Sequence, residues 1–384
     1  LLSDIAVPIA KLVNMKKYKE KDFLNPRRDT DFLNKNNFDK SLTTDEQFID
    51  EYQILTVSSQ ESCNRHVIFL HGGAYVMRAV RGHKNIIEKL VKKYQLKVTF
   101  IDYPLAPENT VEKAHKVVME AYRKVTKKYK NDEFYLFGDS SGGGLALAFL
   151  QRLKEEKQLP FPKKTVLMSP WADVSMTNEE IEEFAEKDPL LPLNGLIITG
   201  KQFAGELDVK DPLISPIYGN MDNLGEIFLI FGTNEILYPD CLKLSDMLEI
   251  AVGTSVEIKI GENLCHDWIL APLKESEETI DKIATKQNKV IDIPYIQDVV
   301  CSYFGVEKEH LVSKSRKREY TLPRQLSMYF AKELTNSTFK KIGKETGGRD
   351  HATVMHACDT IRDLSNIDRE IKKYVKDLSD KIKN

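Results

Sequence analysis

Short apolar segments alternate with longer amphipathic segments along the first three-quarters of the chain. The apolar segments are rich in Val, Ile and Phe and occupy residues 67–70, 98–102, 134–137, 166–168, 227–231 and 256–260. The segments with apolar residues at helical spacing occupy residues 83–94, 111–129, 143–156 and 239–251. Because strands that alternate with helices require crossover connections, this pattern predicts an α/β fold with a mainly parallel sheet covered on both faces. The functional groups of such a sheet gather at the carboxyl ends of its strands.

The composition is that of an ordinary globular protein. With 384 residues, 41% of them hydrophobic and 30% charged, the chain is long enough for two or three domains. No apolar run approaches the roughly 18 residues that a membrane helix needs. The five cysteines are scattered and form no C-x-x-C pair, which argues against disulfides and a zinc site. We therefore expect a cytoplasmic protein with no membrane partner and no metal.

The charge changes sign along the chain, although the net charge is only −2. Residues 286–384 contain 20 Lys and Arg against 14 Asp and Glu, a balance of +6, whereas the preceding residues have a balance of −8. This asymmetry suggests that only the C-terminal quarter meets a polyanion.

A glycine-flanked serine follows the apolar segment 134–137. The sequence Gly138-Asp139-Ser140-Ser141-Gly142 has the G-x-S-x-G pattern, and an amphipathic segment comes after it. The glycines permit a tight strand-to-helix turn that exposes the Ser140 hydroxyl, and the helix N-terminus favours developing negative charge. Ser140 is therefore the candidate nucleophile.

A second glycine pair follows the apolar segment 67–70. The sequence His71-Gly72-Gly73-Ala74 is typical of a loop whose backbone N–H groups bind an oxyanion together with the residue after the nucleophile. The expected oxyanion donors are the N–H groups of Gly72, Gly73 and Ser141. We interpret His71 as a structural histidine without a role in proton transfer.

A base and an acid are needed to activate the serine. His266 follows the last apolar segment, where the chain order Ser, acid, His places the base. Two carboxylates follow the segment 227–231, namely Glu235 and Asp240. We favour Glu235, because Asp240 can be explained as the start of the next helix. The expected catalytic set is Ser140, Glu235 and His266.

These motifs together resemble the hormone-sensitive-lipase-like branch of the α/β-hydrolases. The resemblance rests on residues 71–75 (HGGAY), 103–108 (YPLAPE), 138–143 (GDSSGG) and 266–268 (HDW). It implies an α/β-hydrolase domain over residues 1–285 that hydrolyses short-chain carboxylic esters through an acyl-enzyme, without a cofactor. A cap over the pocket is expected from about residues 1–50 and 175–220. The chain departs from many members of the family by having Glu at position 235 instead of Asp.

The C-terminal quarter has helical patterns throughout. They occupy residues 293–304, 311–314, 322–334, 338–345, 350–364 and 368–381. The fourth and fifth helices are joined by Gly347-Gly348, and two helices joined by a glycine turn indicate a helix-turn-helix whose second helix reads DNA. We therefore expect a small all-α domain over residues 286–384.

This domain resembles the C-terminal DNA-binding domain of the bacterial replication initiators of the DnaA family. The resemblance rests on the basic run 314–318, the segment Pro323-Arg324-Gln325 and the turn 347–351 (GGRDH). It implies binding to a short asymmetric box in double-stranded DNA, with Arg316 in the minor groove. The implied phosphate contacts are Arg324, Gln325 and Lys332, and the implied base contacts are Asp350, His351, Ala352 and Thr353. Family members commonly have Thr or Ser where this chain has Ala352, so we expect altered affinity and not lost recognition.

Three explanations of the combination stay open. The chain is a natural esterase with an appended DNA-binding domain, an esterase with a foreign tail, or a DNA-binding regulator whose hydrolase half senses a ligand. The short final amphipathic segment at 273–284 favours the foreign tail, and the complete catalytic set argues against the sensor. The sequence contains no P-loop, so we expect the chain to bind a box without opening DNA.

Overall fold

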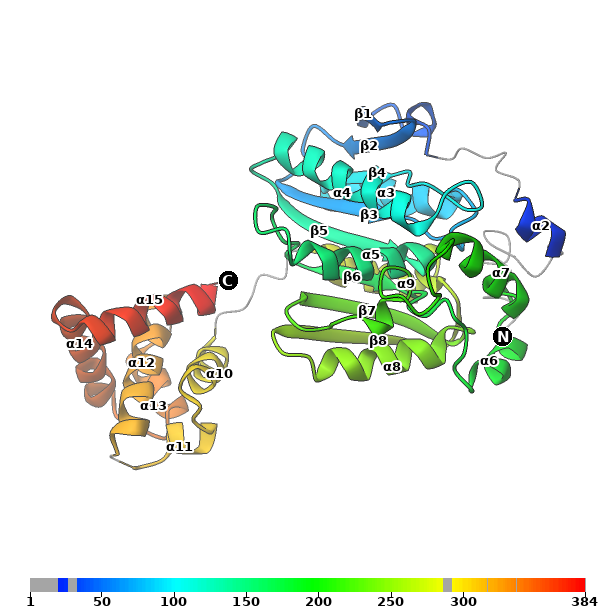
Figure 1. The fold of residues 1–384 in the computed structure, drawn as a ribbon. Helices are drawn as coiled ribbons and strands as arrows, with labels where there is room; N and C mark the ends of the chain where they lie inside the picture. The colour runs from blue at the N-terminus through cyan, green and yellow to red at the C-terminus, as the bar shows by residue number, and fades with distance from the viewer. Residues whose placement is uncertain (1–19, 27–32, 286–291, 316, 336, 384) are drawn as a thin grey trace. The chain divides into compact units, whose positions relative to one another are not determined.

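The protein folds as two compact units, Leu1–Thr285 and Lys286–Asn384, shown in Figure 1. The computed structural model describes residues 20–26, 33–285, 292–315, 317–335 and 337–383. Each unit has its own cluster of buried apolar side chains. Among the described residues, no helix combines the length and the apolar character needed to cross a membrane.

The first unit is built on an eight-stranded sheet in the order β1-β2-β4-β3-β5-β6-β7-β8. The strands are β1 (Thr43–Ile49), β2 (Tyr52–Ser58), β3 (Arg65–Leu70), β4 (Lys97–Ile101), β5 (Glu133–Asp139), β6 (Thr165–Met168), β7 (Gly225–Asn234) and β8 (Thr254–Cys265). Strand β2 pairs antiparallel with both of its neighbours, β1 and β4, and the remaining pairs are parallel. The predicted α/β class is therefore confirmed, and the predicted strands correspond to β3 through β8.

Two strands at one edge of the sheet were not predicted. Residues 43–49, which the sequence analysis assigned to the cap, form the edge strand β1 and pair with β2 over their whole length. The cap assignment is wrong for these residues because β1 is polar and half exposed, so it lacks the apolar signature of a buried strand. The buried run Ile54–Val57 in β2 was a readable strand signal.

Helices cover the sheet, and they bury the faces that the amphipathic pattern predicts. The main ones are α3 (Arg81–Tyr94), α4 (Val111–Lys128), α5 (Ser140–Leu153), α8 (Tyr238–Glu249) and α9 (Lys274–Ala284). The central helix α5 is almost wholly buried, since twelve of its fourteen residues are buried. This helix follows β5 directly, which places its first turn at the carboxyl end of the parallel strands.

Three short helices lie in the two segments expected to form a cap. These are α2 (Glu20–Leu24), α6 (Ile181–Lys187) and α7 (Leu193–Ala204), which gather at one end of the sheet in Figure 1. A Cβ atom on Gly195 in α7 would lie 2.6 Å from the ring of Phe23 in α2, so the two segments pack closely together. Glycine at position 195 is what permits this approach.

The second unit is all helical, as predicted. Its helices are α10 (Ile293–Phe304), α11 (Lys308–Val312), α12 (Arg318–Leu334), α13 (Phe339–Glu345), α14 (His351–Ile367) and α15 (Arg369–Lys383). Polar side chains cap several of them: Asp292 accepts from the Tyr295 N–H at 2.8 Å, and Asp350 accepts from the Thr353 N–H at 2.7 Å. Such caps fix helix starts, which is why the sequence located them well.

Candidate active site and candidate nucleic-acid interface

The turn between β5 and α5 holds Ser140 in a strained conformation. Its φ is +50°, in the left-handed region that side chains rarely adopt. A Cβ atom on Gly138 would clash with the Gly142 carbonyl oxygen, and one on Gly142 would clash with the Leu70 carbonyl oxygen. The two glycines of the motif therefore permit a close approach that pushes the Ser140 hydroxyl out of the sheet.

The side chains of Ser140, Glu235 and His266 follow different strands and meet at the His266 imidazole. His266 follows β8, and its Nε2 lies 2.8 Å from Ser140 Oγ. Its Nδ1 lies 3.0 Å from Oε2 of Glu235, which follows β7. The other carboxylate oxygen of Glu235 accepts from the Gly232 N–H at 3.3 Å. With a proton on Nδ1 held by Glu235, Nε2 is left as an acceptor for the serine hydroxyl proton.

The alternative acid lies elsewhere. Asp240 is in the first turn of α8, and its Oδ1 accepts from the Asn178 side chain at 2.9 Å. Burial raises the pKa of Asp240 to about 6. The geometry thus brings Glu235, the residue favoured by the sequence analysis, to His266, while Asp240 is bound to Asn178.

A second carboxylate, which the sequence analysis missed, contacts the imidazole. Asp267 Oδ2 lies 3.2 Å from His266 Nε2, and Asp267 is buried. Burial disfavours the charged imidazole, but Asp267 and then Glu235 outweigh it and raise the pKa of His266 well above its ordinary value. Burial also raises the pKa of Asp267 to about 6.

The glycine pair after β3 lies beside this imidazole. Gly72 and Gly73 line a small pocket together with Ser140, His266 and Asp267. Gly73 has a φ of +129°, and a Cβ atom there would lie 2.6 Å from the Met77 carbonyl oxygen, so only glycine suits this position. The third expected donor, Ser141, follows Ser140 in the first turn of α5.

His71 fixes the glycine loop. It is buried, its Nδ1 lies 2.6 Å from the Gly72 carbonyl oxygen, and its ring stacks on Tyr103 with centroids 4.7 Å apart. The Tyr103 hydroxyl donates to the His71 carbonyl at 2.6 Å. Burial lowers the pKa of His71 to about 4, so the ring is neutral. These contacts support the structural interpretation of His71.

Asp188 is another residue that the sequence analysis missed. It is buried, and its carboxylate accepts from the N–H groups of Leu190 at 2.7 Å, Leu191 at 3.0 Å and Ile236 at 2.8 Å. It therefore ties the segment before α7 to the residue after Glu235. Because these partners are 48 residues apart, no local pattern could have identified this link.

Among the described residues, no group of three or more His, Cys, Asp or Glu side chains is arranged to hold a metal ion.

The start of α14 presents the expected DNA-reading residues to solvent. Asp350, His351, Ala352 and Thr353 are all exposed. Hydrogen bonding to the Thr353 N–H lowers the pKa of Asp350, so the cap is charged. Asp350 thus fixes the helix start while its exposed side keeps an acceptor available, which is compatible with reading a base edge.

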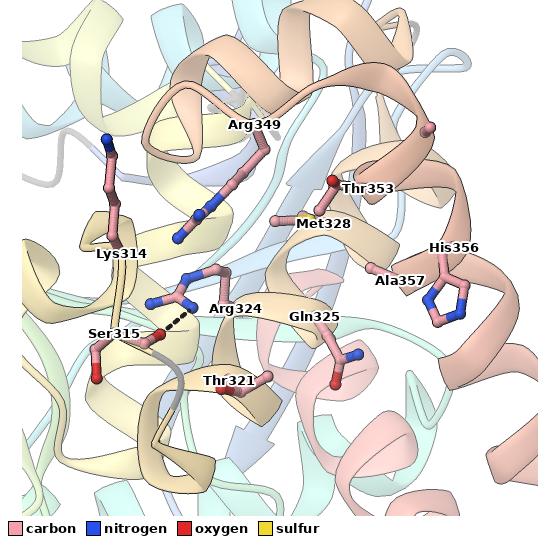
Figure 2. A pocket seen from close by; sticks show the side chains of 11 residues that line it. Lys314, Ser315, Thr321, Arg324, Gln325, Met328, Arg349, Thr353, His356 and Ala357 are labelled. Carbon is pink, nitrogen blue, oxygen red and sulfur yellow. Dashed lines mark hydrogen bonds between the residues drawn. The ribbon is translucent and has the colours of Figure 1, made fainter.

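A pocket beside these residues is lined by cationic side chains. Its walls come from the loop before α12, from α12 and from α14, and Figure 2 shows Arg324 and Arg349 extending toward the loop that carries Lys314 and Ser315. Arg349 donates to the Ser313 carbonyl at 2.5 Å. Gln325, expected at a phosphate, also lines this pocket.

Two residues expected at phosphates have other contacts. Arg324 is 6% exposed and donates to the carbonyl oxygens of Leu311 at 2.5 Å, Ser315 at 2.9 Å and His310 at 3.1 Å. These contacts hold the basic loop, and the phosphate contact of Arg324 stays a prediction.

Lys332 lies with its ammonium group 4.9 Å from the centre of the Phe339 ring and donates weakly to the Ser337 carbonyl. Its ammonium group thus packs at the start of α13. Arg316, expected in the minor groove, lies outside the described residues.

Comparison with known proteins matches each unit to a different family. Residues 67–270 match the alpha/beta hydrolase fold family. An esterase of Acinetobacter venetianus is 29% identical over 232 residues, which are 59% of this chain and 76% of that protein. The crystal structure of a hormone-sensitive lipase from a metagenome library superposes with a TM-score of 0.60 at 27% identity, covering 64% of this chain and 83% of the other.

Residues 293–361 match the bacterial dnaA protein helix-turn-helix family. The chromosomal replication initiator protein DnaA of Flavobacterium psychrophilum is 41% identical over 110 residues, which are 29% of this chain. The chain spans only 23% of the length of that initiator. Both resemblances inferred from the sequence are therefore confirmed, the second for the DNA-binding part of the initiator alone.

Proposed function

Because the chain belongs to the α/β-hydrolase fold family, we propose that its first unit is a serine carboxylesterase acting on short-chain esters through an acyl-enzyme. The observation that carries the proposal is the continuous contact from Ser140 Oγ to His266 Nε2 at 2.8 Å and from His266 Nδ1 to Glu235 at 3.0 Å. The names of the similar proteins, an esterase and a hormone-sensitive lipase, support this substrate class.

Each residue has a role in the proposed reaction. His266 accepts the Ser140 proton while Ser140 Oγ attacks the ester carbonyl carbon, and Glu235 stabilises the imidazolium that forms. The N–H groups of Gly72, Gly73 and Ser141 stabilise the oxyanion of the tetrahedral intermediate. His266 then protonates the leaving alcohol, which leaves Ser140 acylated. Water, deprotonated by His266, attacks the acyl-enzyme and releases the carboxylic acid.

Hydrolysis of p-nitrophenyl butyrate tests this proposal. We expect turnover by the whole chain and its loss in Ser140→Ala, because removal of the nucleophile typically costs several orders of magnitude in rate. Ser245→Ala, which removes another buried serine whose hydroxyl donates to the Leu242 carbonyl within α8, is the matched control and should keep wild-type turnover. Equal rates for wild type and Ser140→Ala would contradict the proposal.

We also propose that the second unit binds a DnaA-type box in double-stranded DNA. The supporting observation is that residues 350–353, at the start of the second helix of the helix-turn-helix, are exposed beside a pocket lined by Arg324, Arg349 and Lys314. The initiator's other activities do not follow, since the chain spans only 23% of it. Because the similar initiators act on bacterial DNA, which lies in the cytoplasm, we infer a cytoplasmic location for this protein.

Fluorescence anisotropy with a duplex carrying an initiator box, against a scrambled duplex, tests this second proposal. We expect tighter binding to the box and a loss of about tenfold or more in His351→Ala, because a lost base contact typically costs 1–3 kcal/mol. Thr360→Ala, further along α14 and bonded within the helix, is the control. Equal affinity for the two duplexes would contradict box recognition. Ester turnover by the whole chain would separate the two esterase explanations from the ligand sensor.

A further inference from the structure

The catalytic imidazole has a carboxylate at each of its two nitrogens. Glu235 contacts Nδ1, as the catalytic set requires, but Asp267 Oδ2 also lies 3.2 Å from Nε2, the nitrogen that exchanges protons with the substrate. Asp267 follows His266 directly and adopts a left-handed conformation with a φ of +52°. This backbone conformation turns the carboxylate back toward the imidazole that precedes it in the chain. The orienting role of Glu235 leaves Asp267 unexplained.

Asp267 faces the place where an acyl group bound to the serine would react. It lines the same small pocket as Gly72, Gly73 and Ser140. Its second oxygen, Oδ1, is buried and has no hydrogen-bond partner among the described residues. Among these residues its carboxylate forms an ion pair with His266 alone.

The neighbouring carboxylate of Asp139 also has a buried Oδ1 without a hydrogen-bond partner among the described residues, but its other oxygen is bound to a different histidine. Asp139 Oδ2 lies 2.9 Å from Nε2 of His83, whose Nδ1 accepts from the Val80 N–H at 2.8 Å. Asp139 is therefore engaged by a residue that takes no part in the reaction. Asp267 is the carboxylate that lies beside Nε2, where it can accept a hydrogen bond from a reacting group.

Water and alcohols differ in the number of O–H groups that can donate hydrogen bonds to His266 and Asp267. A nucleophile that attacks the acyl-enzyme donates one proton to His266 Nε2. Water has a second O–H group, which can donate a hydrogen bond to an acceptor beside Nε2. An alcohol has no second O–H group. An ester oxygen leaving during acylation likewise has no second proton. An acceptor at this place therefore favours attack by water over attack by an alcohol.

We propose that Asp267 is a catalytic residue that selects water over alcohols as the acceptor of the acyl group. The inference rests on the proposed acyl-enzyme at Ser140. The water oxygen forms a bond to the acyl carbonyl carbon as one proton moves to His266 Nε2. The other proton stays on the water oxygen and is hydrogen-bonded to the Asp267 carboxylate. The bond from the carbonyl carbon to Ser140 Oγ then breaks, His266 returns its proton to Ser140, and the carboxylic acid leaves.

Partition of the acyl-enzyme between water and methanol tests this inference. The enzyme is given p-nitrophenyl butyrate in buffer containing methanol, and butyric acid and methyl butyrate are quantified. The variants are Asp267→Gly, which removes the acceptor, and Asp267→Asn, which keeps a neutral one. Both replacements tolerate a left-handed φ. We expect the ratio of acid to methyl ester to fall about tenfold in Asp267→Gly, the usual effect of losing one hydrogen bond to a charged group, and less in Asp267→Asn.

The ratio separates this role from a general effect on the base. Both nucleophiles need His266, so a change in its pKa or position alters both products together and leaves their ratio unchanged. An unchanged ratio in Asp267→Gly would therefore overturn the inference, whatever happens to the total rate. Asp240→Asn, which alters a buried carboxylate paired with Asn178, is the matched control and should keep the wild-type ratio.

A second measurement distinguishes failure of the inference from failure of the proposed esterase function. Intact-protein mass spectrometry of the wild type, quenched during turnover, should detect a butyryl group that is absent in Ser140→Ala. If no acyl group forms on Ser140, both the proposed function and the inference fall. If it forms and the ratio stays constant among the variants, only the inference falls.

Discussion

Strained residues concentrate around the catalytic imidazole. Ser140, Asp267, Ala74 and Tyr75 all have a φ between +50° and +61°, and each such conformation costs about 1–3 kcal/mol in a residue other than glycine. Close packing maintains them: Tyr75 stacks on Phe203 with ring centroids 3.9 Å apart and is fully buried. The site is therefore held in its reactive geometry by the core beneath and around it, at a cost in stability.

The carboxylates around His266 predict the pH dependence of the reaction. Asp267 and Glu235 raise the pKa of His266, and Asp188 is also close enough to interact with it. Because the base must be neutral, kcat/KM should rise with pH through this raised pKa and be lost at lower pH. In Asp267→Asn one of these carboxylates is removed, so the pKa of His266 should fall and the rising limb should move toward acid.

The pH profile of kcat/KM for p-nitrophenyl butyrate checks this shift. Asp240→Asn, which does not touch the imidazole, should leave the limb where it is in the wild type. If kcat/KM rises at the same pH in Asp267→Asn and in the wild type, Asp267 does not raise the pKa of His266.

Among the helices and strands, those marked by residues close in the sequence were predicted, and features fixed by distant contacts were not. Helix α10 was predicted at its observed bounds because Asp292 caps its start and Gly305, with a φ of +64°, ends it. The meeting of Ser140, Glu235 and His266 was predictable because each of them follows a strand of the sheet. Strand β1 was missed because its polar, half-exposed sequence resembles a loop, and Asp188 was missed because its partners lie far along the chain. The contacts of Arg324 with main-chain carbonyls were not predicted, because such contacts leave no trace in a motif.

The glycine turn between α13 and α14 offers a test with a built-in control. A Cβ atom on Gly347 would clash with the Val312 carbonyl oxygen, whereas one on Gly348 would meet nothing within 4 Å, and both residues have a left-handed φ. Gly348→Ala should therefore cost about 1 kcal/mol of unfolding free energy, from backbone strain alone. Gly347→Ala should cost about 3 kcal/mol or more, because the clash adds to the strain.

Urea unfolding followed by circular dichroism, together with box affinity, measures this difference. Both tryptophans, Trp171 and Trp268, lie in the first unit, so tryptophan fluorescence should report an unchanged transition in both variants. Equal losses in Gly347→Ala and Gly348→Ala would contradict the packing of the turn against α11.

Across the whole first unit, buried neutral histidines predict a loss of stability in acid. Burial lowers the pKa of both His71 and His115 to about 4. In the unfolded chain each titrates near its ordinary value of about 6.5, so the unfolded state binds protons first as the pH falls. Their contribution to stability is complete above about pH 6.5 and is lost progressively toward pH 4, by an amount on the order of a few kcal/mol for the pair.

Unfolding in urea at pH 7 and pH 5, followed by tryptophan fluorescence, should show this loss. His115→Gln should reduce the difference between the two pH values, since it removes one of the groups that titrate. The matched control is His356→Gln, an exposed residue of the second unit. The same acid sensitivity in His115→Gln and wild type would contradict the assignment.

At the scale of the whole molecule, each proposed activity is complete within one unit. Every contact described for Ser140, Glu235 and His266 lies within Leu1–Thr285, and every contact described for the helix-turn-helix lies within Lys286–Asn384. The first unit, with a balance of −8, has little to attract DNA, whereas the second has a balance of +6. The two chemistries are therefore separable by their residues, their cores and their charge.

This separation predicts the behaviour of the two halves. Residues 1–285 expressed alone should hydrolyse p-nitrophenyl butyrate with the kcat/KM of the whole chain, because all catalytic groups and their supporting contacts are retained. Residues 286–384 expressed alone should bind the box duplex with the affinity of the whole chain, and this affinity should fall steeply with salt as bound counterions are released. Tryptophan fluorescence confirms folding of the first fragment and circular dichroism that of the second. If the first fragment folds but shows no turnover, the second unit contributes to catalysis. If DNA changes the rate of the whole chain but not that of the first fragment, a regulator is favoured over an esterase with a tail.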